Sequence, residues 1–273
     1  MNRIKLITFD LDGTLLNRKK QLSERTARAL LRAAEAGITV VPATGRAFNG
    51  LPEALRRLPC IRYGIIVNGA GVVDSATGES VYRAELPNAQ ALEIMRYLDT
   101  LPVVYDCFLE GQGYMSRSMM ERLDIFRNPS LAELMQKTRL PVDDLKSYVR
   151  ERGLDAQKVQ LATGDPALRL ELLAHLPERF AAISVSSSWS VNVEINTARA
   201  TKGQAMQALA AHLGISMAEV MAFGDASNDR DMILCAGVGV VMENGQDELK
   251  EQAQIIAPDC DDDGVAQIIE KLL

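Results

Sequence analysis

The sequence predicts an α/β protein with a doubly wound parallel sheet and an inserted α+β unit. Three observations predict this class. The first and last thirds of the chain alternate short apolar strands with helices, polar residues follow the strands, and the middle third has a different pattern. Strands that alternate with helices are typical of a parallel sheet covered on both faces. At 273 residues, the chain is long enough for one large or two modest domains.

The first third of the chain is predicted to hold three strands. They are residues 4–9, 38–41 and 65–67. Ser23 stands where a helix N-cap belongs, apolar residues recur after it at helical spacing, and Gly37 provides a stop. A second helical stretch ends near residue 58, and Gly50 and Pro52 interrupt its beginning.

The last third repeats this alternation. Its predicted strands are residues 220–223, 237–241 and 255–257, and its predicted helices are residues 202–213 and 265–273. Together with the first third, these elements predict a single parallel sheet between two layers of helices.

The middle third has strands of a more alternating, half-buried kind. They are predicted at residues 103–108 and 184–192, with helices at residues 89–98, 131–137, 142–151 and 167–176. We therefore expect an inserted α+β domain at residues 84–191 and a core domain built from residues 1–83 and 192–273.

Composition and charge disfavour several classes of protein. The 30 basic and 36 acidic residues give a net charge of −6 without a basic stripe, which disfavours nucleic acid and anionic membranes as partners. Two histidines are too few for a His-rich zinc site, and the four cysteines lack C-x-x-C spacing. No apolar run reaches the roughly 18 residues of a membrane helix, and the N-terminus does not resemble a signal peptide. We expect a cytoplasmic protein with reduced thiols.

Polar residues stand at the ends of four predicted strands. They are Asp10 and Asp12, Thr44-Gly-Arg, Asn68-Gly and Gly224-Asp. Ligands of open parallel sheets bind outside the carboxyl ends of the strands, so these residues are expected to converge. Each cluster has a simpler explanation alone: a hairpin turn at Asp12, an N-cap at Thr44, a solvated acidic turn at Asp225. If all of these simpler explanations were correct, the clusters would stand at matching strand ends only by coincidence.

Charge adds a second indication of a ligand site. Carboxylates crowded at one sheet edge need protonation or a bound cation, and oxygen ligands without His or Cys favour Mg²⁺. Lys202 and Arg46 lie near the starts of predicted helices, where a cation opposes the helix dipole unless an anion such as phosphate binds there. The alternative is that both side chains point into solvent. A cation site, an anion site and an aspartate pair are the parts that phosphoryl transfer needs.

The same residues resemble the motifs of the haloacid dehalogenase superfamily. The four motifs, in order, resemble Asp10-Leu-Asp-Gly-Thr-Leu-Leu, Thr44-Gly-Arg, Lys202-Gly and Gly224-Asp-Ala-Ser-Asn-Asp. Three further stretches resemble its Cof-type phosphatase branch: Val191-Asn-Val-Glu-Ile, Ala236-Gly-Val-Gly and Asp263-Gly-Val-Ala. The resemblance implies a Rossmann-like core with an inserted cap domain that closes over the site. Ala226 departs from the branch, which often has Asn or Gly there.

The resemblance also implies a role for each motif residue. Asp10 would be the nucleophile that forms an aspartyl-phosphate, and Asp12 would protonate the leaving oxygen and then activate water. Mg²⁺ would be bound by Asp10, the Asp12 carbonyl and Asp225, with Asp229 in support. The phosphoryl oxygens would be held by Leu11, Thr44, Gly45, Lys202 and Asn228. The candidate substrate contacts of the core are Arg46, Asn68 and Gly69.

The expected function is that of a Mg²⁺-dependent phosphatase for monoesters of small phosphorylated metabolites, such as sugar phosphates or a phosphorylated cofactor. An aspartate at position 12 resembles phosphatases and mutases, so a phosphomutase is the first alternative. A phospho-accepting signalling module is the second. Cap residues such as Tyr114, Arg117 or Trp189 are candidates for reading the substrate, and their alternative is a place in the core or surface of the cap. Substrate identity and oligomeric state stay open.

Overall fold

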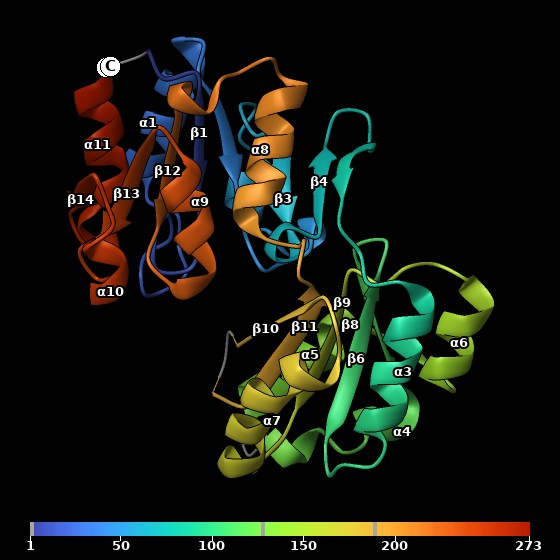
Figure 1. The fold of residues 1–273 in the computed structure, drawn as a ribbon. Helices are drawn as coiled ribbons and strands as arrows, with labels where there is room; N and C mark the ends of the chain where they lie inside the picture. Colours follow the sequence, from blue (N-terminus) through green and yellow to red (C-terminus); the bar gives the residue numbers. More distant parts are fainter. Residues whose placement is uncertain (1–2, 127–128, 188–189) are drawn as a thin grey trace. The chain divides into compact units, whose positions relative to one another are not determined.

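The chain forms two compact units, each with its own sheet and its own hydrophobic core (Figure 1). The computed structural model describes residues 3–126, 129–187 and 190–273, so Trp189 lies outside the described residues. The first unit combines Met1–Arg83 with Thr201–Leu273, and the second unit is Ala84–Ala200.

The main sheet of the first unit is parallel throughout, as predicted. Its strand order is β14-β13-β12-β1-β2. The strands are β1 (Leu6–Phe9), β2 (Thr39–Pro42), β12 (Val220–Gly224), β13 (Val238–Met242) and β14 (Ile255–Ala257). Because β1 lies between β12 and β2, all four of its residues are buried.

Helices cover both faces of this sheet, which gives the doubly wound arrangement. On one face, Ile7 and Phe9 of β1 pack with α1 (Glu24–Glu35) and α11 (Gly264–Leu272). On the other face, Leu6 packs with α8 (Lys202–His212) and α9 (Arg230–Cys235). The remaining helices are α2 (Glu53–Arg56) and α10 (Asp247–Lys250). The predicted N-cap is present, since the Ser23 hydroxyl accepts the N–H of Thr26 at 3.0 Å.

The strand predicted at residues 65–67 requires a correction. It is β3 (Tyr63–Ile66), which pairs antiparallel with β4 (Gly71–Asp74), and β5 (Ser80–Arg83) completes a three-stranded sheet. β3 meets the main sheet through one parallel bridge, between Ala43 and Ile65. Val67 is excluded from the strand because it begins a short 3-10 turn, Val67–Gly69, with φ angles of 50°, 57° and 93°.

The second unit is built on a six-stranded sheet with the order β10-β11-β9-β6-β7-β8. The strands are β6 (Val104–Leu109), β7 (Gln112–Ser116), β8 (Arg139–Val142), β9 (Lys158–Ala162), β10 (Ile183–Ser186) and β11 (Asn192–Thr197). The pairing is antiparallel except between β7 and β8. The helices are α3 (Asn88–Leu98), α4 (Arg117–Met120), α5 (Pro129–Thr138), α6 (Leu145–Arg152) and α7 (Pro166–Arg179).

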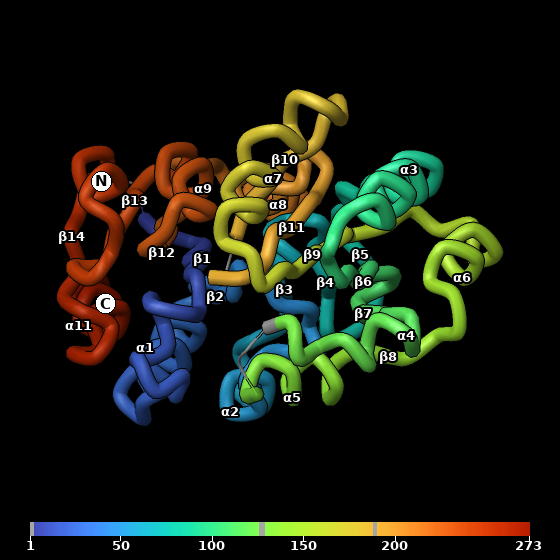
Figure 2. Tube along the Cα trace, turned by 90° about the horizontal axis from the view of Figure 1, so that it is seen from below, coloured from blue at the N-terminus to red at the C-terminus, as the bar shows by residue number. Residues whose placement is uncertain are grey.

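The two faces of this sheet pack differently. Tyr105, Cys107, Leu161 and Val193 form an apolar core with α3, α6 and α7, and α3 and α6 lie side by side (Figures 1 and 2). A smaller apolar cluster on the opposite face includes Met135 of α5. The unit is therefore the α+β arrangement that the alternating strands predict.

The predicted boundary of the inserted unit is wrong at its C-terminal end. The core was expected to resume at residue 192, but the first unit resumes at Thr201. The reason is that Asn192–Thr197 is a strand bonded on both edges, to β9 and to β10. A single strand was predicted at residues 184–192, but the structure has two strands there, β10 and the beginning of β11.

The sequence also predicted reduced thiols and contained no apolar run as long as a membrane helix. All four cysteines are free thiols. Within the described part of the chain, no helix has both the length and the apolar character that crossing a membrane requires.

Candidate active site

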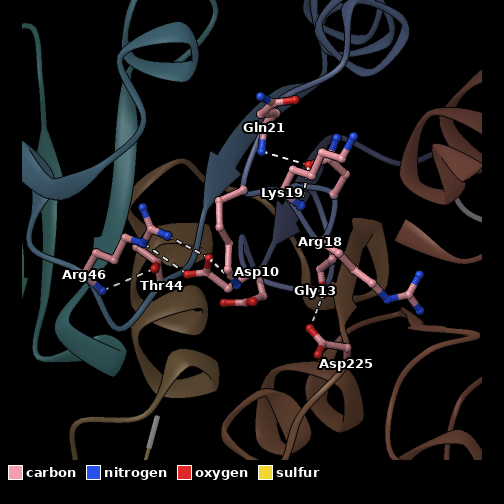
Figure 3. A network of polar contacts seen from close by, with 12 residues as sticks. Asp10, Gly13, Arg18, Lys19, Gln21, Thr44, Arg46 and Asp225 are labelled. Carbon is pink, nitrogen blue, oxygen red and sulfur yellow. Dashed lines mark hydrogen bonds and ion pairs between the residues drawn. The ribbon is translucent and has the colours of Figure 1, made fainter. Parts of the chain in front are cut away.

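Four loops of the first unit meet at the carboxyl edge of its parallel sheet. They follow β1, β2, β3 and β12, and they carry Asp10, Thr44, Asn68 and Asp225. Figure 3 shows Asp10 between Thr44 and Arg46 on one side and Asp225 on the other. The main-chain registers explain this convergence: the N–H of Asp10 donates to the Phe223 carbonyl, and the N–H of Ala43 donates to the Phe9 carbonyl.

Lys202 is the buried cation of the site. Its side chain has no exposed surface, and its Nζ donates to Asp10 Oδ1 at 2.5 Å and to Asp229 Oδ1 at 2.6 Å. Lys202 is the first residue of α8, where the helix dipole is unfavourable for a cation. Burial lowers the pKa of Lys202, but the two carboxylates outweigh it and raise the pKa above its usual value. The ammonium group therefore stays charged.

Asp229 is fully engaged by the protein. While Oδ1 accepts from Lys202, Oδ2 accepts the N–H groups of Asp225 at 3.0 Å and Ala226 at 3.1 Å. These bonds shape the loop after β12 and hold Asp225 in place. Ala226 contributes to this loop through its backbone N–H.

Asp10 and Asp225 are the carboxylates that crowd the site most. Burial raises the pKa of Asp10 to about 7, with Asp229 adding to the effect and Lys202 opposing it. Burial, with Asp229 again adding to the effect, raises the pKa of Asp225 to about 6. Asp225 Oδ1 accepts the Thr14 hydroxyl at 2.6 Å. Both carboxyl groups are thus less acidic than usual because negative charge accumulates in a buried space.

A divalent cation fits this group of carboxylates. One oxygen from each of Asp10, Asp225 and Asp229 lies within 4.8 Å of the others. Asp229 already uses both oxygens, whereas Asp10 Oδ2 accepts no hydrogen bond from any described residue. A cation between Asp10 and Asp225 would offset the repulsion that raises their pKa values, and carboxylate oxygens are the ligands that Mg²⁺ prefers.

Asp12 has the opposite environment from Asp10. Arg46 binds it with two hydrogen bonds, Nε to Oδ2 at 3.0 Å and Nη2 to Oδ1 at 2.7 Å, and Lys20 Nζ lies 2.9 Å from Oδ1. Burial would raise the pKa of Asp12, but Arg46 and Lys20 outweigh it and lower the pKa. Asp12 is therefore ionised, and Arg46, expected as a candidate substrate contact, is bound to this aspartate.

The expected phosphate-binding groups include two main-chain donors with no acceptor. Among the described residues, the N–H groups of Leu11 and Gly45 donate to nothing, in loops directly after β1 and β2. The neighbouring Thr44 hydroxyl accepts the N–H of Arg46 at 3.2 Å. Unpaired N–H groups beside a buried ammonium are a suitable environment for an oxyanion.

The turn after β3 carries Asn68 and Gly69, and Asn228 of the loop after β12 contacts this turn. The exposed Asn228 donates its Nδ2 to Asn68 Oδ1 at 3.3 Å, and the N–H of Asn68 donates to the Thr44 carbonyl at 3.0 Å. Gly69 packs against the backbone before Lys202: a Cβ added there would lie 2.1 Å from the Thr201 carbonyl oxygen. In this structure Asn228 is thus in contact with Asn68.

Three residues contribute to the site that sequence reasoning did not single out. Thr14 binds Asp225, Lys20 pairs with Asp12, and Asp231 accepts the N–H of Gly203 at 3.0 Å at the start of α8. Thr14 lies within the first motif, directly after its Asp-Gly, and this position could have identified it as a site residue from the sequence. Lys20 lies in a run of basic residues at the surface, and no pattern marks it.

Two of the candidate cap residues have partners within the second unit. The Tyr114 ring lies 4.8 Å from the Tyr148 ring, measured between centroids, and Arg117 pairs with Asp143 at 3.1 Å.

Comparison with known proteins places the chain among phosphatases. A family model described as haloacid dehalogenase-like hydrolase matches residues 7–269. The phosphatase YwpJ of Bacillus subtilis (strain 168) is 30% identical over 287 residues, covering 99% of this chain and 100% of that protein. The HMP-PP phosphatase of Escherichia coli O8 (strain IAI1) is 31% identical over 259 residues, covering 91% and 87%.

Solved structures have the same fold. A haloacid dehalogenase-like hydrolase from Bacteroides thetaiotaomicron superposes with a TM-score of 0.85 at 27% identity, covering 99% of this chain and 100% of that chain. A haloacid dehalogenase-like hydrolase from B. subtilis gives a TM-score of 0.83 at 30% identity, with the same coverage. The predicted α/β fold class is confirmed by these likenesses.

Replacing Lys202 tests the buried ion pairs. Lys202→Met leaves Asp10 and Asp229 buried without their cation, and we expect a loss of about 3–5 kcal/mol in the free energy of unfolding. The control is Lys5→Met, which removes the half-exposed pair with Glu219 and should cost less than about 1 kcal/mol. Urea unfolding without divalent cations measures both, and equal losses would show that the buried pairs contribute no special stability.

Replacing Gly69 tests the close packing behind Lys202. Gly69→Ala places a methyl group against the Thr201 carbonyl, whereas Gly78→Ala has the same kind of positive φ, 75°, and open space around it. Both variants bear the left-handed backbone penalty of about 1–2 kcal/mol. The clash should cost Gly69→Ala about 1–3 kcal/mol more. Calorimetric melting compares them, and indistinguishable melting temperatures would contradict the observed packing.

Proposed function

Since the chain belongs to the haloacid dehalogenase-like hydrolases and is a phosphoric monoester hydrolase, we propose that it uses Mg²⁺ and a phosphoryl group carried on Asp10 to hydrolyse small phosphorylated metabolites. One observation supports this most directly. The buried Asp10 lies beside a fully buried Lys202, in a loop whose Leu11 N–H has no acceptor among the described residues.

In the first step, Asp10 attacks the phosphorus of the ester. Oδ2 is the oxygen proposed to react, because Oδ1 is bound to Lys202. A bond forms between Oδ2 and phosphorus, the bond to the leaving oxygen breaks, and that oxygen takes the electron pair together with a proton from Asp12. Lys202 and the N–H groups of Leu11 and Gly45 stabilise the charge on the phosphoryl oxygens.

In the second step, water attacks the phosphorus of the aspartyl-phosphate. Asp12, now ionised, accepts the proton of the water, and the bond between phosphorus and Asp10 breaks to release inorganic phosphate. The Arg46 pair stabilises ionised Asp12, which is the form needed in this step. From the ionised form bound to Arg46, Asp12 must gain a proton before the first turnover. The proton that it accepts from water in the second step then restores the acid form for the next cycle.

The metal would be held by Asp10, Asp225 and the carbonyl of Asp12. It would neutralise part of the negative charge on the phosphoryl group. Asp229 would act on the metal site indirectly, since its two oxygens hold Lys202 and the loop that carries Asp225.

The substrate class is proposed from the relatives. Besides the HMP-PP phosphatase of E. coli, they include two 5-amino-6-(5-phospho-D-ribitylamino)uracil phosphatases of Bacillus subtilis, YwtE and YcsE, which are 27% and 28% identical to this chain. These names describe small phosphorylated metabolites. The second unit would act as the cap that recognises the leaving group, and Tyr114 and Arg117 stay candidates for substrate contacts.

The nucleophile is tested by Asp10→Asn. We expect turnover to fall by at least about 10³-fold, because a neutral amide cannot take up the phosphoryl group. Phosphate release from a panel of sugar phosphates and p-nitrophenyl phosphate measures the loss, and the melting temperature checks the fold. The control is Asp74→Asn, which changes another buried aspartate, one that pairs with Arg62 and lies outside the proposed site. Near-normal turnover by Asp10→Asn would refute the proposal, and isomerised substrate without free phosphate would indicate a mutase.

The metal is tested by chelation. Treatment with EDTA followed by its removal should stop phosphate release, and added Mg²⁺ should restore it. Asp225→Asn should raise the Mg²⁺ concentration needed for half-maximal rate, because it removes a charged ligand. Full activity after exhaustive chelation would exclude the cation from the mechanism.

A further inference from the structure

The loop after β13, residues 243–246, contacts two of the loops that build the candidate site. The N–H of Gln246 donates to the carbonyl of Asp225 at 2.9 Å. Asn244 Nδ2 donates to the carbonyl of Gly13 at 2.8 Å. One contact reaches the loop after β12, and the other reaches the loop after β1. The proposed mechanism assigns no role to either contact.

Both ends of the Asn244 side-chain amide form hydrogen bonds. While Nδ2 donates to Gly13, Oδ1 accepts the N–H of Cys260 at 2.9 Å. A carbonyl can only accept and a backbone N–H can only donate, so these two partners fix which way the amide points. Neither a carboxylate nor an apolar side chain of similar size can form both bonds. The position therefore requires a group that donates at one end and accepts at the other.

The accepting end of this amide is anchored in the hydrophobic core of the first unit. Cys260 directly follows the β14 segment, is 4% exposed, and belongs to the same apolar cluster as Met242 of β13 and Val265 of α11. Because this cluster is packed between the sheet and its helices, it gives the amide a fixed point of attachment. Asn244 thus connects the loop after β1 to the packed core.

The donating end holds a peptide that lies beside Asp225 (Figure 3). Gly13 has a φ angle of 94°, and a Cβ added there would lie 2.6 Å from Asp225 Oδ2. The next residue, Thr14, is 1% exposed and donates its hydroxyl to Asp225 Oδ1 at 2.6 Å. The peptide between Gly13 and Thr14 is planar, so holding its oxygen also restrains the backbone of Thr14. The bond from Asn244 therefore restrains the residue that binds the Asp225 carboxylate.

We propose that Asn244 is a positioning residue for the divalent cation. It fixes the peptide between Gly13 and Thr14, and the Thr14 hydroxyl in turn fixes the carboxylate of Asp225. This inference rests on the proposed function, which gives the cation Asp10 and Asp225 as ligands. Groups that orient metal ligands without touching the metal control its affinity, and their loss typically weakens binding about 10- to 100-fold. A contact that only stabilises the fold would not change cation affinity in this way.

The test is Asn244→Leu, which keeps the approximate size of the side chain and removes both hydrogen bonds. Mg²⁺ is titrated calorimetrically into metal-free wild type and variant, without substrate. We expect the dissociation constant for Mg²⁺ to rise about 10-fold or more. In phosphate release, the Mg²⁺ concentration for half-maximal rate should rise by the same factor, while kcat at saturating Mg²⁺ should change less than about 3-fold. An unchanged affinity for Mg²⁺ would overturn the proposal.

The matched control is Gln254→Met, which acts at the opposite end of β13. Gln254 Oε1 accepts the N–H of Gly239 at 2.6 Å, so this variant also removes a bond between a side-chain amide and the backbone of the first unit. Both variants should lower the melting temperature measured without Mg²⁺, but Gln254→Met should keep the wild-type affinity for Mg²⁺. Equal weakening of Mg²⁺ binding in the two variants would indicate general loosening of the unit and would contradict a positioning role.

A double-mutant cycle tests the connection through Thr14. Thr14→Val removes the hydroxyl that binds Asp225 and keeps the shape of the side chain. Because both changes break the same connection, the double variant should bind Mg²⁺ about as weakly as the weaker of the two single variants. Losses of affinity that multiply would show that the two residues act independently, against the proposal. If Asn244→Leu does not fold, Asn244→Ala is measured in its place.

Calorimetry without substrate separates this inference from the proposed function. If the wild type binds Mg²⁺ but releases phosphate from no ester, the proposed reaction fails. A dissociation constant for Mg²⁺ that is about 10-fold higher in Asn244→Leu would then still support the positioning role. If the wild type releases phosphate and Asn244→Leu binds Mg²⁺ equally tightly, the reaction stands and the inference fails. A wild type that binds no Mg²⁺ would overturn the inference as well.

Discussion

The buried ammonium group of Lys202 is the constraint on which the first unit depends. A lone charge without exposed surface would be very costly, so its neighbours must be carboxylates placed at hydrogen-bond distance. Asp10 comes from the loop after β1 and Asp229 from the loop after β12. One cation thus joins three segments that are distant in sequence. The same contact sets the orientation of Asp10, which the proposed chemistry needs.

Two aspartates only two residues apart acquire opposite properties in this setting. Asp10 is buried with other carboxylates, and its pKa is raised; Asp12 is bound by Arg46 and Lys20, and its pKa is lowered. Pairs of titratable groups with diverging pKa values are typical of sites that divide nucleophilic and acid–base roles. Here the division follows from which side chains surround each carboxylate, since the two residues lie in the same loop.

The sheet of the second unit has two different faces. One packs in an apolar core, and the other carries buried polar and charged side chains. Its apolar side, with α3, α6 and α7, is sufficient to form a hydrophobic core. Its other side buries the paired charges Arg139–Asp106 and Lys158–Glu194, which contribute little net stability compared with apolar residues of similar size.

The sequence by itself determined the parallel sheet, the N-cap at Ser23, the four motifs and the segments that carry them, because hydrophobic periodicity and cap chemistry are local signals. It did not determine that residues 192–197 join the second unit, since an alternating strand has the same pattern in any sheet. Nor did it indicate that Lys20 and Arg46 bind Asp12, or that Asp106 lies across from Gln160 and Glu194. Those contacts depend on strand register and on side chains brought together from distant segments, which only the tertiary structure decides.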